Sequence, residues 1–302
     1  MNRAIITGST GAIGMALINK LIRGNVEVLV LSRKDSKRIC QIPKHPLVSI
    51  GYCDLSEYKD YQNTTGKNYD VFFHFAWDGT FGNTRNDMYL QNQNVKYALD
   101  AVYLAKRFGC HTFIGAGSQA EYGRVDFPLG SGTPTAPENG YGIAKCCAGY
   151  MTKILCKQLE LRFNWVRILS IYGPYDGANT MVMSTIYKLL KNETPKFTKC
   201  EQMWDYLYSD DAADAFFIIA NKGENGKIYV LGSGIVLPLK EYIFKIRDCI
   251  DETRNVDIGA IPYGENQVMY LCADIRELRS IGFTPKISFS EGIKLVLKNM
   301  KL

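Results

Sequence analysis

The feature that most constrains the fold is an alternation, along the first half of the chain, of short β-branched runs with longer segments of helical pattern. Runs typical of strands lie at 5–6, 26–31, 47–52, 71–75, 111–116 and 165–171, and segments typical of helices lie at 14–23, 87–108 and 141–159. Strands joined by crossover helices form parallel sheets. The sequence therefore predicts an α/β protein with a doubly wound parallel sheet.

After residue 172 the alternation becomes irregular. Helical patterns recur at 181–190, 210–221, 239–250 and 289–297 among turn-rich segments, and no Pro/Ser-rich linker separates the two halves. We therefore expect a main domain at 1–172 with a returning segment around 205–232. A smaller, closely packed lobe is expected from 173–204 and 233–302.

Composition excludes several classes of function. The net charge of +6 on 302 residues is too small and diffuse for nucleic-acid binding, and the longest apolar stretches, such as 216–220, are far shorter than a bilayer span. Polar residues at 7–11 end the apolar start too early for a signal peptide. Nine scattered cysteines without C-x-x-C and only three histidines indicate free thiols, no metal site and a cytoplasmic location.

The clearest motif is Gly-x-x-Gly-x-x-Gly at Gly8, Gly11 and Gly14, directly after a predicted strand and opening a predicted helix. Glycines there let the backbone approach a pyrophosphate, and free N–H groups at the helix start bind the anion. The motif predicts a Rossmann-type dinucleotide site that includes Thr10, Ala12 and Ile13. The alternative is a tight turn without a ligand.

Two further segments bear on the cofactor. The second strand ends at Ser32 and Arg33, where NAD-binding proteins usually carry an acidic residue; a hydroxyl and a guanidinium suit a 2′-phosphate, so NADP(H) is favoured and NAD(H) stays possible. The alternative is a solvated loop. Asp54, followed by Leu55, either bounds the adenine or caps a helix.

The candidate catalytic pair is Tyr141 and Lys145, whose i, i+4 spacing places phenol and ammonium on one helix face. A fixed cation lowers a phenol pKa and makes proton exchange feasible. Composition alone predicts about 1.4 chance matches to Tyr-x-x-x-Lys, and the second match, Tyr187 and Lys191, is interpreted as a helix-surface pair. Ser118 precedes Tyr141 at the carboxyl end of a strand, where parallel sheets bind ligands.

These motifs together resemble the extended short-chain dehydrogenase/reductases of the nucleotide-sugar epimerase/dehydratase family. The resemblance covers nearly the whole chain, from the glycine loop through 74–76, 118–123 and 167–174 to 204–213. It implies that Tyr141 is the acid/base, that Lys145 holds the nicotinamide ribose, and that Ser118 binds the reacting sugar oxygen. The smaller lobe would bind a sugar nucleotide. The implied cofactor-binding residues also include Phe75, Ala76, Asn94 and Ile171, and the implied substrate-binding residues include Trp77, Gln119 and Trp204.

Three departures from the family narrow the reaction. Family dehydratases carry Asp-Glu after the serine or threonine; here the pair is Gln119-Ala120, which disfavours a dehydratase unless Glu121 substitutes. Arginines that hold the substrate diphosphate are missing: Trp204 stands at the first position, and only Asn266 and Gln267 lie near the second. Lys196 and Lys199 are possible replacements. Trp204 and Asn94 each have a purely structural alternative.

The combination of 74–77 with 117–123 resembles 4-ketoreductases of deoxysugar pathways, including CDP-abequose synthases. We therefore expect NADPH-dependent reduction of a 4-keto-6-deoxyhexose nucleotide at C4. A 4-epimerase with tightly bound NAD is the alternative, and a non-catalytic dinucleotide sensor is the third hypothesis. Wide apolar faces at 87–108 and 141–159 predict a homodimer through a four-helix interface, as in many relatives.

Overall fold

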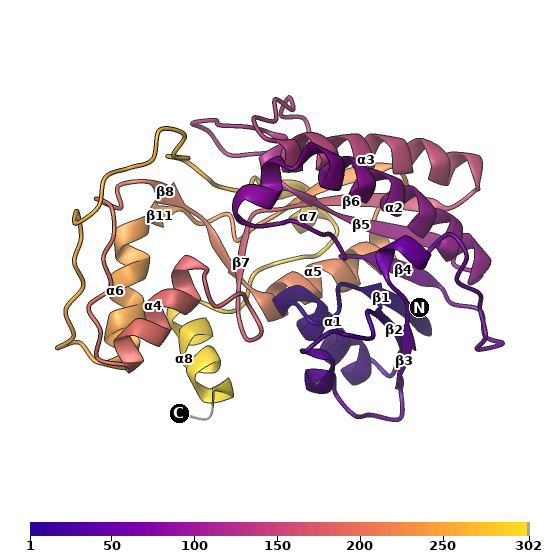
Figure 1. Cartoon of the computed structure of the whole chain (residues 1–302), viewed down its shortest axis with the longest axis horizontal. Helices are drawn as coiled ribbons and strands as arrows, with labels where there is room; N and C mark the ends of the chain where they lie inside the picture. Colours follow the sequence, from indigo (N-terminus) through magenta and orange to yellow (C-terminus); the bar gives the residue numbers. More distant parts are fainter. Residues whose placement is uncertain (301–302) are drawn as a thin grey trace.

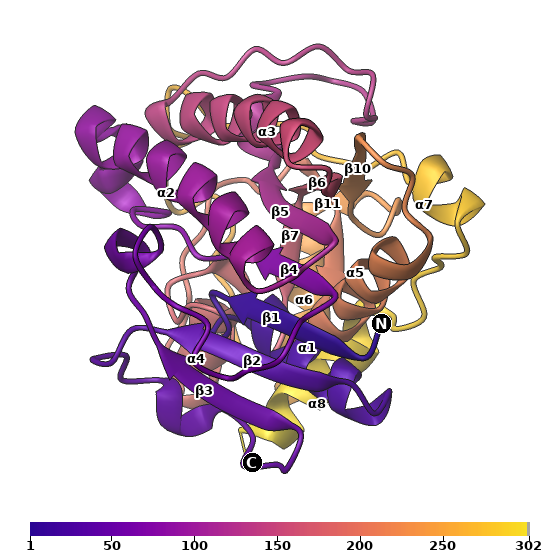
Figure 2. The same cartoon turned by 90° about the vertical axis from the view of Figure 1, so that its right-hand side faces the viewer.

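In the computed structural model, which describes residues 1–300, seven parallel strands form one central sheet in the order β10-β6-β5-β4-β1-β2-β3. The strands are β1 (Arg3–Thr7), β2 (Glu27–Ser32), β3 (Val48–Tyr52), β4 (Val71–His74), β5 (Thr112–Ser118), β6 (Arg162–Ile168) and β10 (Lys227–Leu231). Figures 1 and 2 show the sheet between two layers of helices. The predicted doubly wound α/β class is confirmed.

Strand alternation decides which helices cover each face of the sheet. Ile6 of β1 belongs to the cluster with α1 (Ala12–Arg23) and α5 (Ser209–Lys222). Its neighbour Ile5 belongs to the cluster with α2 (Met88–Arg107) and α3 (Gly140–Gln158). Successive side chains of a strand point to opposite faces, so both faces of β1 are buried.

The predicted strand at 165–171 is wrong in its extent. The structure has β6, which ends at Ile168, and a separate strand β7 (Ser170–Tyr172) that pairs in parallel with β9 (Tyr206–Tyr208). Leu169 between them donates its N–H to the carbonyl of Leu231 in β10. The chain therefore leaves the central sheet after Ile168.

The smaller lobe packs α4 (Met181–Leu190), α6 (Leu239–Ile250) and α8 (Phe289–Asn299) around a cluster that includes Ile186, Ile246 and Ile293 (Figure 1). β8 (Met203–Trp204) pairs antiparallel with β11 (Leu237–Pro238). The segment that contains α7 (Arg276–Ser280) packs on the main cluster through Leu278 and Phe283. The exact division into domains remains a prediction.

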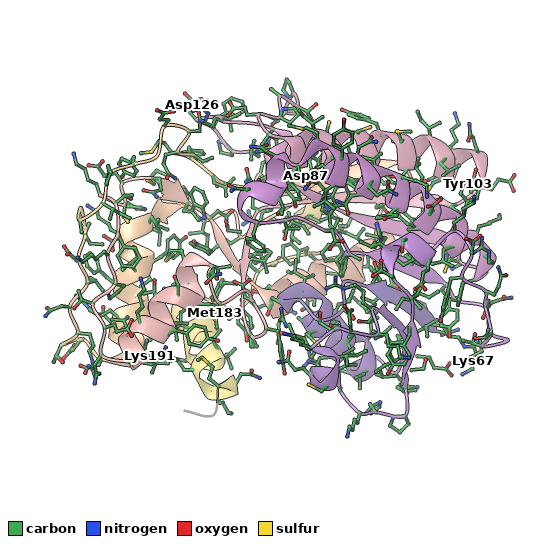
Figure 3. All side chains as sticks on the ribbon, viewed as in Figure 1. Lys67, Asp87, Tyr103, Asp126, Met183 and Lys191 are labelled. Atoms are coloured by element: carbon green, nitrogen blue, oxygen red, sulfur yellow. The ribbon has the colours of Figure 1, made fainter. Side chains whose placement is uncertain are left out.

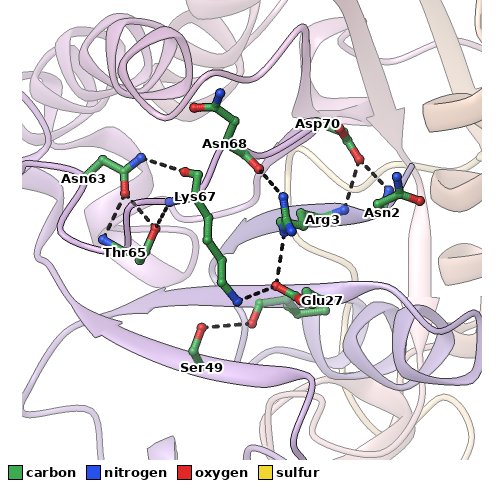
Figure 4. A network of polar contacts seen from close by, with 10 residues as sticks. Asn2, Arg3, Glu27, Ser49, Asn63, Thr65, Lys67, Asn68 and Asp70 are labelled. Atoms are coloured by element: carbon green, nitrogen blue, oxygen red, sulfur yellow. Dashed lines mark hydrogen bonds and ion pairs between the residues drawn. The ribbon is translucent and has the colours of Figure 1, made fainter.

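A polar network closes the amino-terminal edge of the sheet (Figure 4). Glu27 accepts from Arg3 Nε at 3.2 Å and from Lys67 Nζ at 2.8 Å, and Asp70 accepts the backbone N–H groups of Asn2 and Arg3. Exposed ion pairs of this kind add little stability each. This edge carries structural contacts, and the candidate chemistry lies at the opposite, carboxyl-terminal edge.

All nine cysteines are free thiols. Within residues 1–300, no helix combines the length and hydropathy needed to cross a bilayer, and no three His, Cys, Asp or Glu side chains gather as metal ligands would.

Candidate active site

The glycine loop turns β1 into α1 at the carboxyl edge of the sheet. Gly8 has φ +65°, and a Cβ there would lie 2.6 Å from the backbone carbon of Phe75. A Cβ on Gly14 would lie 2.6 Å from the carbonyl oxygen of Gly8. Both glycines are therefore required for close backbone packing, one against the loop after β4 and the other against the turn itself.

Gly11, unlike Gly8 and Gly14, is not needed for close packing. Open space at Gly11 is what the binding of a pyrophosphate requires. A Cβ on Gly11 would meet nothing nearer than the carbonyl oxygen of Gly8, at 3.7 Å. Gly11 precedes α1, has no side-chain cap, and leaves the first-turn N–H groups free to bind an anion. Ser9 Oγ is buried without a hydrogen-bond partner among the described residues. Both observations fit the approach of a phosphate group.

A cavity of about 430 Å³ extends from this loop along the sheet edge. Its lining includes the predicted residues Gly8, Thr10, Gly11, Ser32, Arg33, Leu55, Phe75, Ala76 and Trp77. Ala12, Ile13, Gly14 and Ile171 do not line it. Ile13 and Ile171 pack against the main hydrophobic cluster instead. The cavity therefore joins the glycine turn to the loop after β4.

Thr7 holds that loop in place. Its Oγ1 accepts the backbone N–H groups of Phe75 and Ala76, both at 3.2 Å, and lies 3.1 Å from Nδ1 of His74. Burial, followed by the positive charge of Lys145, lowers the pKa of His74 to about 3. His74 therefore stays neutral near pH 7, and its Nδ1 shares a hydrogen bond with the Thr7 hydroxyl. Phe75 and Ala76 are fixed as one wall of the cavity.

The far end of the cavity is lined by Ser32, Arg33, Ser36 and Arg38. Arg38, which sequence analysis missed, donates to the carbonyl of Tyr175. Asp54 is the N-cap of the short helix Leu55–Glu57, accepting from Ser56 N at 3.2 Å. The structure thus shows the capping role of Asp54, whereas Leu55 beside it faces the cavity.

The candidate catalytic pair lies on α3, whose N-cap is Asn139, accepting from Gly142 N at 2.9 Å. Lys145 is buried and donates from Nζ to the carbonyl of Ala116 in β5 at 2.7 Å. Burial raises the pKa of Tyr141, whereas a side-chain hydrogen bond with Ser118 and the positive charge of Arg85 lower it. The structure therefore brings Ser118, Tyr141 and Lys145 together.

Trp77, in the loop after β4, lies against the catalytic pair. Its ring is 3.8 Å from Lys145 Nζ and meets the Tyr141 ring edge-on at 6.2 Å. The indole N–H donates to Gln91 Oε1 at 2.9 Å, which fixes the ring. Burial lowers the pKa of Lys145 to about 7, although Glu121 raises it. Burial therefore disfavours the charged form of Lys145 in the ligand-free protein.

Glu121 does not serve as a substitute acid. Its Oε1 accepts from Ser118 N and from Trp165 Nε1, both at 2.9 Å, and its Oε2 accepts from Arg167 Nε at 2.7 Å. Glu121 and Arg167 are 1% and 2% exposed, so no substrate group reaches the carboxylate. The pair instead fixes the backbone of Ser118 at the end of β5 and links the short helix Gln119–Glu121 to β6.

A second cavity, of about 580 Å³, is lined by Arg85, which contacts the Tyr141 ring, but Ser118, Tyr141 and Lys145 line neither cavity. Gln119 also lines this second cavity, together with the polar residues Asn86, Arg124, Glu138, Asn139 and Asn266. Arg124 pairs with Glu138 at 2.8 Å. Arg85 and Arg124 are cations that the sequence analysis missed, because neither belongs to a motif that it considered. Lys196 and Lys199 are exposed and do not line this cavity.

Two predicted residues act on the backbone or in packing. Asn94 accepts from Asp78 N and donates to the carbonyl of Asp78, both at 2.9 Å, so it positions the loop from α2 without lining either cavity. Trp204 donates to Ser170 Oγ at 2.8 Å and packs against the main cluster. Asn94 and Trp204 therefore make the contacts that a purely structural role predicts. Their contacts with cofactor or substrate remain predictions.

Comparison with known proteins identifies the family. Residues 4–232 match the model of the NAD dependent epimerase/dehydratase family. The chain is 26% identical to a putative UDP-glucose 4-epimerase of Methanocaldococcus jannaschii (98% of both chains) and 23% identical to the CDP-abequose synthase of Salmonella typhimurium (98% of this chain, 97% of the other). The chain therefore belongs to this family of enzymes, and the resemblance found in the sequence is confirmed.

Solved structures show the same fold. A UDP-N-acetylglucosamine 4-epimerase from Methanobrevibacter ruminantium, in complex with UDP-N-acetylmuramic acid, is 21% identical with a TM-score of 0.89 over 99% of this chain and 98% of that one. Other structures of this fold are complexes with NAD or with NADPH. A nicotinamide dinucleotide is therefore the cofactor class of the family, and these structures do not distinguish the two forms for this chain.

Proposed function

We propose that this member of the NAD dependent epimerase/dehydratase family reduces a 4-keto-6-deoxyhexose nucleotide at C4, with NADPH as the cofactor. The observation that carries the proposal is the convergence of Ser118, Tyr141 and Lys145 at one sheet edge. The Tyr141 ring meets Trp77, which lines the first cavity, and Arg85, which lines the second. Gln119-Ala120 offers no acid pair, and Glu121 is buried in an ion pair. Proton transfer by a single phenol therefore fits this site better than removal of water.

Each residue of the site has a defined task in this reaction. Tyr141 donates its phenolic proton to the oxygen of the C4 carbonyl, and the Ser118 hydroxyl donates a hydrogen bond to the same oxygen. The bound NADPH supplies the hydride. Lys145 holds the ribose hydroxyls, and Trp77 limits the space above the sugar ring. Solvent then returns a proton to Tyr141, so the ketone gains one hydride and one proton in total.

The 4-epimerase remains the second candidate because relatives with that description align over nearly the whole chain. The two activities differ in their use of cofactor. Incubation with NADPH and a panel of 4-keto-6-deoxy sugar nucleotides should consume NADPH in proportion to product. Conversion of UDP-glucose or UDP-galactose without net cofactor consumption, by protein purified with NAD already bound, would establish the epimerase instead.

The preference for NADPH is proposed from the far end of the first cavity. Arg33, Arg38, Ser32 and Ser36 line that end, and the described lining residues there include no carboxylate. A charge-assisted contact with a 2′-phosphate is worth about 1.5–3 kcal/mol, or roughly 10- to 150-fold in Kd. Arg33→Ala should weaken NADPH binding within that range in calorimetry and leave NADH binding unchanged.

The control is Lys34→Ala, which removes an exposed neighbouring charge that does not line the cavity. It should change NADPH affinity only slightly. If Arg33→Ala and Lys34→Ala weaken NADPH binding equally, the contact is general attraction and the assignment of Arg33 is wrong.

The remaining biological expectations are also proposals. We propose a homodimer, a cytoplasmic location and a role in polysaccharide biosynthesis, since deoxysugar nucleotides are the proposed products.

A further inference from the structure

We propose that Arg85 is a positioning residue for Tyr141: its guanidinium lies on the phenol ring and supplies the permanent positive charge beside it. The guanidinium carbon is 4.5 Å from the centroid of the Tyr141 ring. Arg85 belongs to the short helix Gly82–Asn86, between β4 and α2, and reaches Tyr141 from outside α3. The inference deepens the proposed function, on which it rests, by adding a residue outside the motif Tyr141-x-x-x-Lys145.

The helix that carries Arg85 is fixed against the start of α3. Asn86 Oδ1 accepts from Gly140 N at 3.0 Å, and Arg85 Nη1 donates to the carbonyl of Thr80 at 3.3 Å. A Cβ on Gly140 would lie 3.0 Å from the carbonyl oxygen of Arg85, so the close approach depends on glycine. Gly140 directly precedes Tyr141. The backbone of Arg85 is therefore docked beside the residue that it contacts.

Lys145 is less suited to this electrostatic role than the motif suggests. Its Nζ lies 5.8 Å from the centroid of the Tyr141 ring but 3.8 Å from that of Trp77, and it donates to Ala116. Burial lowers the pKa of Lys145 to about 7 and raises the pKa of Tyr141 above its ordinary value. In the ligand-free protein, Lys145 is therefore already neutral at the pH where Tyr141 ionises. A guanidinium keeps its charge throughout this range.

The other groups around Tyr141 do not replace this charge. Ser118, on β5, contributes a neutral hydroxyl. Glu121 acts from the short helix Gln119–Glu121 and raises the pKa of Tyr141, but Arg167 pairs with its carboxylate at 2.7 Å. Arg85 is thus the cation whose effect on the phenol persists at alkaline pH.

The test measures the ionisation of Tyr141 directly, without substrate. The full-length protein is produced with 3-fluorotyrosine, which ionises at a somewhat lower pH than tyrosine, and its fluorine NMR spectrum is followed against pH. Tyr141→Phe assigns the resonance. Arg85→Gln should raise the pKa of Tyr141 by about 1–3, the range expected for loss of an adjacent opposite charge. Arg85→Lys should restore most of this change.

Two comparisons separate the proposal from a general effect of charge. Arg124→Gln removes the other arginine of the same cavity, which pairs with Glu138, and should leave the pKa of Tyr141 nearly unchanged. Lys145→Met should raise it by less than Arg85→Gln does. An unchanged Tyr141 titration in Arg85→Gln overturns the proposal, as does an equal change in Arg124→Gln.

Arg85→Met is a second neutral replacement, and its titration decides the question if Arg85→Gln does not fold. Because the titration needs neither substrate nor cofactor, the proposed reaction can fail in the substrate panel while this result stands. Conversely, the titration of Arg85→Gln can be unchanged while the substrate panel still shows the proposed reduction.

Discussion

Burial of Lys145 places an electrostatic cost at the centre of the site. The side chain is 4% exposed, and desolvation is the main cause that lowers its pKa to about 7 from an ordinary value of 10.5. A group whose charged form is disfavoured in the folded state destabilises the fold at every pH where the unfolded chain carries that charge. The same residue that is expected to hold the ribose therefore reduces stability.

Lys145→Met should accordingly stabilise the protein near neutral pH. Below about pH 7 the lysine is charged in both states and the full cost applies, on the order of 5 kcal/mol at most. Between pH 7 and 10.5 the folded state has lost the proton that the unfolded chain keeps, so the cost declines as pH rises. Melting temperatures at pH 7 and pH 9 test this: the gain should be larger at pH 7. Lys153→Met, on the exposed face of α3, should show no such difference.

Tyr141→Phe removes only the phenolic oxygen. General acid catalysis contributes typically 10²–10⁴-fold, so turnover should fall by about that factor, whereas NADPH affinity should barely change. The matched control is Tyr187→Phe, the chance motif on α4, which is 37% exposed and lines neither cavity. If Tyr187→Phe abolishes turnover while Tyr141→Phe retains it, the mechanism has been assigned to the wrong tyrosine.

At the residue scale, the sequence predicted the groups that motifs mark and missed those that only the fold brings together. Ser118, Tyr141 and Lys145 carry a recognisable spacing. Glu121 and Arg167 are 46 positions apart and meet because β5 and β6 are neighbours, with Ser118 opposite Ile168 in the register. Arg85 lies in a short 3₁₀ helix that has no periodic pattern to predict it.

At the element scale, two glycines of the turn from β1 to α1 have different roles: Gly8 is needed for packing, whereas Gly11 is expected to allow ligand binding. Gly8→Ala forces a left-handed residue and a contact with Phe75, so it should destabilise the fold by about 1–3 kcal/mol. Gly11→Ala meets no close neighbour, and its φ of −84° suits alanine, so stability should hold. The added methyl should still obstruct the pyrophosphate and weaken NADPH binding by about tenfold or more, or 1.4 kcal/mol. Denaturant unfolding and calorimetry measure the two effects separately.

Gly11→Ala protein that is as stable as wild type but binds NADPH equally well would contradict the cofactor assignment of this loop. The structural alternative, a tight turn without a ligand, predicts that outcome.

The long elements followed from sequence periodicity, and the short ones did not. α2 and α3 have 20 and 19 residues, enough for several turns of apolar pattern. β8 and β11 have two residues each and show no alternation that distinguishes them from loops. The strand predicted at 165–171 covered two strands because the apolar run continues through Leu169, where the chain passes from the central sheet to the pairing with β9.

At the scale of the whole molecule, an apolar stripe on α3 faces away from the sheet. Ile143, Tyr150, Met151 and Ile154 recur at helical spacing and are 51%, 52%, 43% and 61% exposed, whereas Ala144 and Ala148 face the core. Tyr103 of the adjacent α2 is also exposed, near the outer end of that helix (Figure 3). An exposed apolar stripe on α3, with an exposed Tyr103 on the α2 that packs against it, favours association with a second copy.

We therefore expect a homodimer in which α2 and α3 of each chain form a four-helix interface. Light scattering at micromolar concentration should give twice the chain mass of 34.0 kDa. Ile154→Glu places a charge in the stripe and should yield monomers, because an unpaired carboxylate is costly to bury. Leu295→Glu, at a 40% exposed apolar position on α8, should leave the mass doubled. A monomeric mass for the unmodified protein would show that the stripe does not form this interface, whatever the variants do.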